Sequence, residues 1–114
     1  MARASVTTQQ VTRTGLNPAL TAPPADGDIV DCGRVALMVT NGSGSPITVT
    51  VEATAAQDGL DVADLVVSVP ASGTRLIGPL PARTFGQPYD SADAGRAFVD
   101  YSAVASVTRA VITI

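Results

Sequence analysis

The sequence contains no histidine, no lysine and no tryptophan, and it has a single cysteine. Without histidine the chain lacks the usual general base near neutral pH and any Ser-His-Asp arrangement. Without lysine it cannot form a Schiff base or a phosphate-binding loop of the Walker type. Cys32 has no second cysteine to pair with, and we interpret it as a small apolar residue in or beside a strand. These absences predict that the chain is not an enzyme.

Charge is also scarce. The seven basic residues are all arginines spread singly along the chain, and ten acidic residues bring the formal net charge to −3. A protein that binds nucleic acid needs a basic face to displace condensed counterions, and no basic cluster occurs. No stretch approaches the roughly 20 apolar residues of a membrane-spanning helix, and residues 1–10 lack the apolar run of a signal peptide. We expect no nucleic acid and no membrane as partners, and a protein made in the cytoplasm.

Acidic residues gather in two short segments, 26–31 and 58–64. Neither segment has the alternating spacing and terminal glutamate of a calcium-binding EF-hand loop, and aspartate in loops ordinarily forms turns. Glu52 and Asp100 could be paired as the two acids of a glycosidase. A chain this small leaves little room for a substrate cleft, however, and Glu52 fits a solvent-facing strand position. We therefore predict no metal and no cofactor.

Valine and threonine dominate what is present, and both favour strands because they are branched at Cβ. The chain has 114 residues, 46% of them hydrophobic, but only four aromatic side chains, so the core must be aliphatic. One domain of this length can fold without disulfides. In 34–40, Val35, Leu37 and Val39 fall on one face at a period of two, and 47–53 alternate cleanly between apolar and polar residues. Both patterns are typical of strands with one buried face, and the second indicates that the other face is wet.

Glycine- and proline-rich turns separate seven predicted strands: residues 29–31, 34–40, 47–53, 65–69, 74–77, 96–102 and 107–114. No segment has a convincing helical stripe, and residues 54–64 are expected to be a connection with at most one helical turn. The pattern predicts an all-β protein, an antiparallel β-sandwich of immunoglobulin-like or jelly-roll type. Few charges protect the sheet edges, so edge pairing with another chain is plausible.

Residues 1–27 differ from the β-sandwich domain predicted for residues 28–114. Residues 5–13 are β-prone with few apolar anchors, and the three prolines and two glycines of 15–27 exclude regular structure. We interpret 1–27 as an extended N-terminal arm and a Pro/Gly loop, docked on its own domain or on a neighbour.

Six residues are candidates for binding a partner: Val6, Val11, Leu16 and Leu20 in the arm, and Phe85 and Tyr89 in a Gly/Pro-rich loop. The arm is expected to dock by strand addition, so that deleting residues 1–16 would abolish binding and leave the domain folded. Phe85 and Tyr89 are either binding anchors or a plug for one end of the sandwich.

Residues 70–80 read Pro-Ala-Ser-Gly-Thr-Arg-Leu-Ile-Gly-Pro-Leu, and residues 99–107 read Val-Asp-Tyr-Ser-Ala-Val-Ala-Ser-Val. These two segments resemble the small capsid-associated proteins of tailed bacteriophages that infect actinobacteria. In that family a proline-glycine turn leads into a T-R-x-I-G-P strand, and a V-x-Y-S strand lies near the C-terminus. The Asp-Gly-Leu-Asp-Val segment at 58–62 is similar too. The resemblance covers residues 28–114.

The resemblance implies a head decoration (cement) protein in the virion, on the capsid surface. Its partners would be the major capsid protein lattice and other copies of itself, either in a homo-oligomer or as neighbours on the capsid, after synthesis in the host cytoplasm. The shared motifs mark the fold, so no binding residue follows from them. Two alternatives stay open: a neck, tail-tube or tail-tip component with the same sandwich, and a carbohydrate- or cell-binding module. The last would usually offer exposed aromatic platforms.

Overall fold

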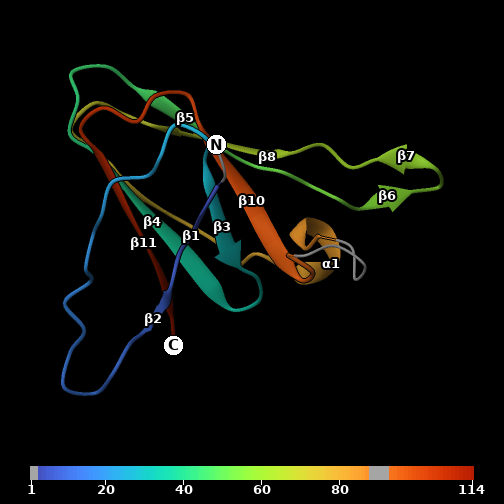
Figure 1. Ribbon diagram of the computed structural model, residues 1–114, viewed down its shortest axis with the longest axis horizontal. Helices are drawn as coiled ribbons and strands as arrows, with labels where there is room; N and C mark the ends of the chain where they lie inside the picture. Colours follow the sequence, from blue (N-terminus) through green and yellow to red (C-terminus); the bar gives the residue numbers. More distant parts are fainter. Residues whose placement is uncertain (1–2, 88–92) are drawn as a thin grey trace.

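The alternating pattern of the sequence becomes two β-sheets packed face to face in a computed structural model, which describes residues 3–87 and 93–114 (Figure 1). Sheet A has the order β1 (Ala4–Ser5), β3 (Asp28–Asp31), β10 (Arg96–Tyr101), β5 (Ile47–Val51), β8 (Leu65–Val69). Sheet B has the order β2 (Thr8–Gln10), β11 (Val107–Thr113), β4 (Val35–Asn41), β9 (Thr74–Ile77). The all-β sandwich is confirmed, and all seven predicted strands are present.

The core between the sheets is aliphatic, as the composition predicts. Inward-facing residues alternate with outward-facing ones along β4 and β5, and the inward set is almost completely buried. The apolar residues with no exposed surface are Val30, Leu37, Val39, Val49, Val51, Val69, Leu80, Ala97, Val99 and Val111. Phe85, the last residue of the short helix α1 (Ala82–Phe85), joins this core and closes one end of it.

Strands pair in a nested series from the ends of the chain inward. β2 pairs with β11, β3 with β10, β4 with β9, and β5 with β8. Three further pairings, β10 with β5, β11 with β4 and β1 with β3, complete the two sheets. Consecutive strands of the sandwich therefore lie in opposite sheets, except β5 and β8, which are neighbours in sheet A.

The named strands of residues 28–114 that form the two sheets pair antiparallel, as predicted, but the N-terminal segment adds to both sheets in parallel, which makes them mixed. β1 runs parallel to β3, and β2 runs parallel to β11. Parallel neighbours need a long crossover, and residues 11–27 form one that loops away from the sandwich before β3 begins (Figure 1). Residues 3–10 are thus part of the two sheets. Residues 11–27 form a loop whose returning limb is held to β11 by a β-bridge between Thr21 and Arg109.

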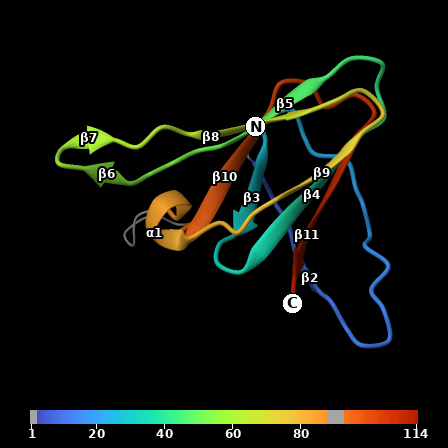
Figure 2. The ribbon, with the colours of Figure 1, turned by 180° about the vertical axis from the view of Figure 1, so that it is seen from behind.

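The segment 54–64 connects β5 and β8 without a helical turn, within the expectation of at most one, and it forms a β-hairpin that was not expected. It contains β6 (Ala56–Gln57) and β7 (Leu60–Asp61), and it projects from sheet A between β5 and β8 (Figures 1 and 2). Asp58 and Gly59 both have positive φ, 53° and 81°. Two positive φ values in a two-residue turn match the twist of a hairpin, and Asp-Gly is a strong signal for it. We call residues 54–64 the finger.

A buried ion pair joins the two sheets. Asp28 of β3 is completely buried, and Arg109 of β11 donates to both of its carboxylate oxygens, at 2.7 Å from Nε and 2.8 Å from Nη2. The Tyr101 hydroxyl donates to the same carboxylate at 2.6 Å. Arg109 also donates to the Thr21 carbonyl at 3.1 Å, which fixes the returning limb of the 11–27 loop. Bidentate pairing satisfies both charges away from water.

Alkaline pH is expected to destabilise the fold through Tyr101. Burial and the neighbouring Asp28 carboxylate raise the pKa of this phenol well above its usual range. A phenol with a raised pKa in the folded state stabilises the fold below its unfolded pKa, near 10, and this contribution is lost as the pH rises further. The free energy of unfolding should fall by about 1.4 kcal/mol per pH unit above about pH 10. Denaturant titrations at several pH values in that range give the free energy of unfolding as a function of pH. This free energy should fall less steeply with pH for Tyr101→Phe than for the unaltered chain. An equally steep fall for both would contradict the assignment.

Candidate interaction surface

The outer face of sheet B is apolar at one end and carries threonines, Thr40, Thr74 and Thr108, at the other. Ala36 lies opposite Ile112, and Met38 lies opposite both Ala110 and Leu76 in the strand register. The corresponding outward positions of β5 in sheet A are threonines. Because a sheet that faces water normally carries polar residues there, the apolar end of this face has the composition of a surface that another molecule covers. Ala110, 1% exposed, is already covered within the chain.

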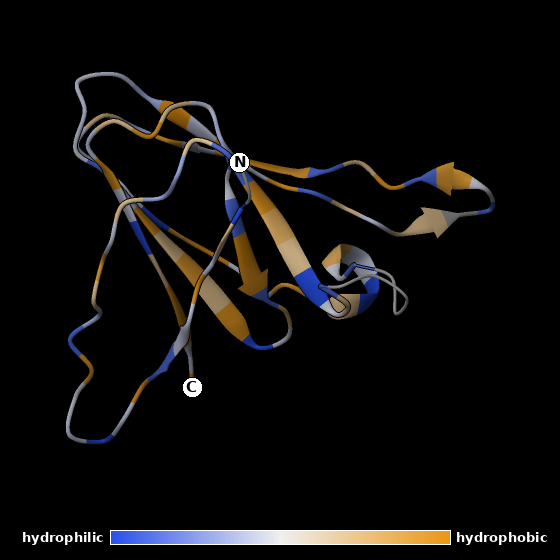
Figure 3. Cartoon of the chain, viewed as in Figure 1, coloured by the Kyte–Doolittle hydropathy of each residue, from blue (hydrophilic) through white to orange (hydrophobic). Residues whose placement is uncertain are grey.

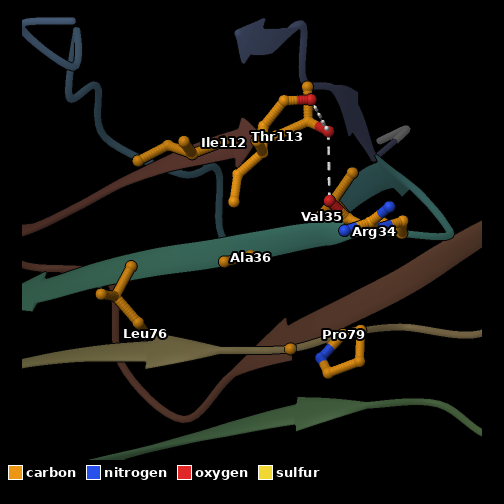
Figure 4. Close-up of a pocket in the computed structure, with 9 residues that line it drawn as sticks. Arg34, Val35, Ala36, Leu76, Pro79, Ile112 and Thr113 are labelled. Atoms are coloured by element: carbon orange, nitrogen blue, oxygen red, sulfur yellow. Dashed lines mark hydrogen bonds between the residues drawn. The ribbon is translucent and has the colours of Figure 1, made fainter. Parts of the chain in front are cut away.

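A groove of about 350 Å³ opens on this face (Figure 4). Its lining residues are Arg34, Val35, Ala36, Leu76, Gly78, Pro79, Ile112, Thr113 and Ile114. Arg34 is the only charged side chain in that set. Leu76 and Ile114 are 65% and 88% exposed, so the apolar rim is open to solvent. The Thr113 hydroxyl donates to the Arg34 carbonyl at 3.1 Å and ties the ends of β11 and β4 together.

Gly78 shapes this groove. A Cβ on residue 78 would lie 2.4 Å from the Val35 carbonyl oxygen, so a side chain there would force β9 away from the start of β4. The motif Thr-Arg-Leu-Ile-Gly-Pro at 74–79 therefore supplies an edge strand with an outward Leu76 and a close approach at its end. The sequence showed this motif but gave no signal that it borders a groove.

The finger carries the second concentration of exposed apolar side chains. Leu60 is 74% exposed and Val62 is 36% exposed. Its tip combines a hydrophilic turn with hydrophobic strand ends (Figure 3). The base is held, because the Ala53 amide donates to Asp64 Oδ1 and the Thr54 amide donates to the Thr84 carbonyl, both at 2.8 Å. A fixed base and an unsupported tip are the geometry of a projecting contact element.

The residues predicted to bind a partner are not brought together. Val6 packs against the chain's own core. Val11 and Leu20, 44% and 37% exposed, lie on the 11–27 loop with the half-buried Leu16. Gln9 holds the returning limb through two hydrogen bonds with the backbone of Ala19.

Of the two aromatic candidates, Phe85 is 9% exposed in the core, so it acts as the plug. Tyr89 lies outside the described residues.

Glu52 and Asp100, the two acids considered for a glycosidase, lie next to each other and hold Arg3. Arg3 pairs with Glu52 at 2.7 Å and with Asp100 at 2.8 Å, and its guanidinium lies 4.6 Å from the centre of the Phe98 ring. The hydrogen bond with Asp100, together with burial, raises the pKa of Glu52. Burial alone would raise the pKa of Asp100, but hydrogen bonds from Glu52 and Arg3 bring it below its ordinary value. This cluster fastens the N-terminal strand to sheet A.

Other candidate chemistry is sparse in residues 3–87 and 93–114. Within these ranges no three His, Cys, Asp or Glu side chains lie close enough together to hold a metal ion. Cys32 packs half-buried against the core, and burial raises the pKa of its thiol, which keeps it in the unreactive protonated form. No helix in the same ranges is long and apolar enough to cross a membrane.

No protein-family model matches the chain, and neither the curated proteins nor the solved structures contain a significant match to it.

Proposed function

We propose that the chain is a structural virion protein that decorates a phage head by binding the lattice of the major capsid protein. It has no catalytic role in this proposal: it acts through surfaces, and repetition on a lattice multiplies a modest affinity per contact. The phage head is proposed as the particle because residues 70–80 and 99–107 resemble capsid-associated proteins.

The observation that carries the proposal is where the exposed apolar side chains lie. They are on the 11–27 loop, on the finger, on the outer edge of sheet A at Val66, and around the groove of sheet B. Large exposed apolar groups on projecting segments cost solubility unless another molecule covers them. A protein that functions when assembled and is made in many copies has this kind of surface.

We infer further that the sandwich is of jelly-roll type. Four strand pairs are nested, and consecutive strands of the sandwich, except β5 and β8, lie in opposite sheets. Two Greek keys that make a jelly roll have this connectivity. An immunoglobulin-like sandwich would instead place the first two strands of residues 28–114 side by side in one sheet, whereas β3 and β4 lie in opposite sheets. The parallel pairing of β2 is a departure from the usual jelly roll. Fold type alone assigns no function, but viral capsid domains use this one.

The 11–27 loop is the surface that we propose meets the shell. Its outward Val11 and Leu20 are open to a partner, whereas Val6 is occupied within the chain. Strand addition by residues 3–10 to another protein would require both of their parallel pairings to open. The shell contact therefore involves the loop and not the strands before it.

Substituting the loop residues tests this proposal. The double variant Val11→Ser, Leu20→Ser should keep the melting temperature of the unaltered chain and lose at least about tenfold in affinity for undecorated heads, because apolar anchors dominate such contacts. Cosedimentation with heads and counting of copies by cryo-electron microscopy measure this. The matched control Ala22→Ser, an exposed position on the same loop, should bind normally. Full occupancy by the double variant would refute the loop contact, and failure of the unaltered chain to bind heads would refute decoration.

A neck, tail-tube or tail-tip component is the second candidate. The finger and the groove lie on different sheets, which suits copies arranged head to tail in a ring. Imaging separates the two: decoration covers the shell with hundreds of copies, and a neck or tail-tip ring contains few. A carbohydrate-binding module has less support, because Phe85 fills the core and Phe98 lies under Arg3.

A further inference from the structure

The finger and the groove have complementary chemistry. The finger offers Leu60 and Val62 with the exposed carboxylates of Asp58 and Asp61, and it has no basic residue. The groove offers apolar walls and one charge of the opposite sign, Arg34. Arg34, Asp58 and Asp61 form no ion pair within residues 3–87 and 93–114. Among the described residues, each surface thus lacks the partner that the other would supply.

The two surfaces do not engage each other within one copy. The finger extends from β5 and β8 of sheet A, whereas β4, β9 and β11 of sheet B form the groove. The finger points along the longest dimension of the molecule, 40 Å, away from the C-terminal end of β11 that borders the groove (Figures 1 and 2). Leu60 remains 74% exposed as a result.

We propose that the finger of one copy seats in the sheet B groove of the next, with Leu60 against Ala36, Leu76 and Ile112 and with Asp61 facing Arg34. The contact is heterologous: every copy has one finger and one groove. Such contacts propagate into a closed ring or an open row of copies. The inference concerns contact between copies and holds whichever particle the protein belongs to.

Two single variants test the contact in solution. Leu60→Asp should disable the finger and keep the groove, and Leu76→Asp should disable the groove and keep the finger. Both side chains are more than half exposed, so both variants should fold, which thermal melts would check. Sedimentation velocity of the full chain up to about 0.1 mM, where micromolar contacts fill, should show assembly of the unaltered chain. Each variant alone should associate at least about tenfold more weakly.

Mixing the two variants gives the decisive result. The intact groove of Leu60→Asp should accept the intact finger of Leu76→Asp, and growth should stop at a one-to-one complex because no free finger-groove pair remains. The matched control Val66→Asp, an exposed apolar residue on the edge strand β8 outside both surfaces, should assemble like the unaltered chain. A monomeric unaltered chain, unchanged assembly of Leu60→Asp, or a mixture without heterodimer would each overturn the proposal.

Charge reversal tests the pairing of Asp61 with Arg34. Arg34→Glu and Asp61→Arg should each weaken association roughly fivefold, in line with an exposed ion pair. The double variant should associate more tightly than either single variant, because the reversed charges attract again. Arg13→Glu, an exposed arginine of the 11–27 loop, is the matched control and should have no effect. Simple additivity of the two reversals would overturn the assigned charge pair.

Discussion

Asp28→Asn is expected to lower the free energy of unfolding by about 3–5 kcal/mol, a large part of the total stability of a domain this size. The asparagine keeps the shape of the side chain but removes its charge, so the Arg109 guanidinium stays buried without a counterion. Asp28 is completely buried and Arg109 is 5% exposed, which leaves little access for water to compensate. Equilibrium unfolding in urea, followed by circular dichroism, measures the loss.

Asp31→Asn is the matched control, because Asp31 lies in the same strand and also pairs with an arginine. The Asp31–Arg96 pair is 3.0 Å long, but its side chains are 45% and 27% exposed. An ion pair in that setting contributes no more than about 1 kcal/mol. Equal losses for the two variants would mean that the Asp28–Arg109 pair does not tie the sheets together.

Deleting residues 1–10 is expected to destabilise the domain, on the order of 4 kcal/mol, and not merely to detach an arm. The deletion removes a strand from each sheet, the Val6 side chain from the core, and Arg3 from Glu52 and Asp100. The two carboxylates are then left side by side without their cation. Thermal melts should show a lower midpoint for the shortened chain.

The double variant Val11→Ser, Leu20→Ser serves as control for the deletion, since it changes the same region and leaves residues 3–10 in place. An unchanged midpoint for the shortened chain would show that its sheets do not need the parallel strands. A truncation of residues 1–16 removes β1 and β2 together with part of the loop, so it mixes loss of stability with loss of contact. The substitutions in the loop are therefore the sharper test of particle contact.

The seven sandwich strands could be predicted because their inward positions are valine, isoleucine and leucine at a period of two. Their pairing could not: the alternation in β4 and β5 sets which face is buried, but not which strand lies next to which. The parallel strands were missed for a related reason. Thr8–Gln10 has almost no apolar residue, and β11 recruits it through the backbone ladder, which leaves no mark on the sequence.

The surfaces were harder to predict than the strands. Val11 and Leu20 could be predicted as exposed contact residues because they are apolar in a polar segment. Ala36 and Met38 could not, because they lie within a run of apolar residues of which only the buried face was considered. Asp58-Gly59 is a clear sequence signal for the hairpin turn of the finger, but from the sequence this segment was interpreted as an acidic cluster within a connection. Arg109 and Asp28 are 81 positions apart, and nothing local indicates that they meet.

The nested strand pairing has a consequence for how the chain reaches its final form. Its innermost pair, β5 with β8, closes a short stretch around the finger, while the outermost, β2 with β11, joins the two ends of the polypeptide. Closing a longer loop costs more entropy and slows folding. Folding of the chain should therefore start with the pairing of β5 and β8 and finish with the pairing of β2 and β11. A ribosome-bound chain that still lacks Val107–Thr113 cannot complete sheet B. Sheet B is therefore completed only after β11 has been synthesised.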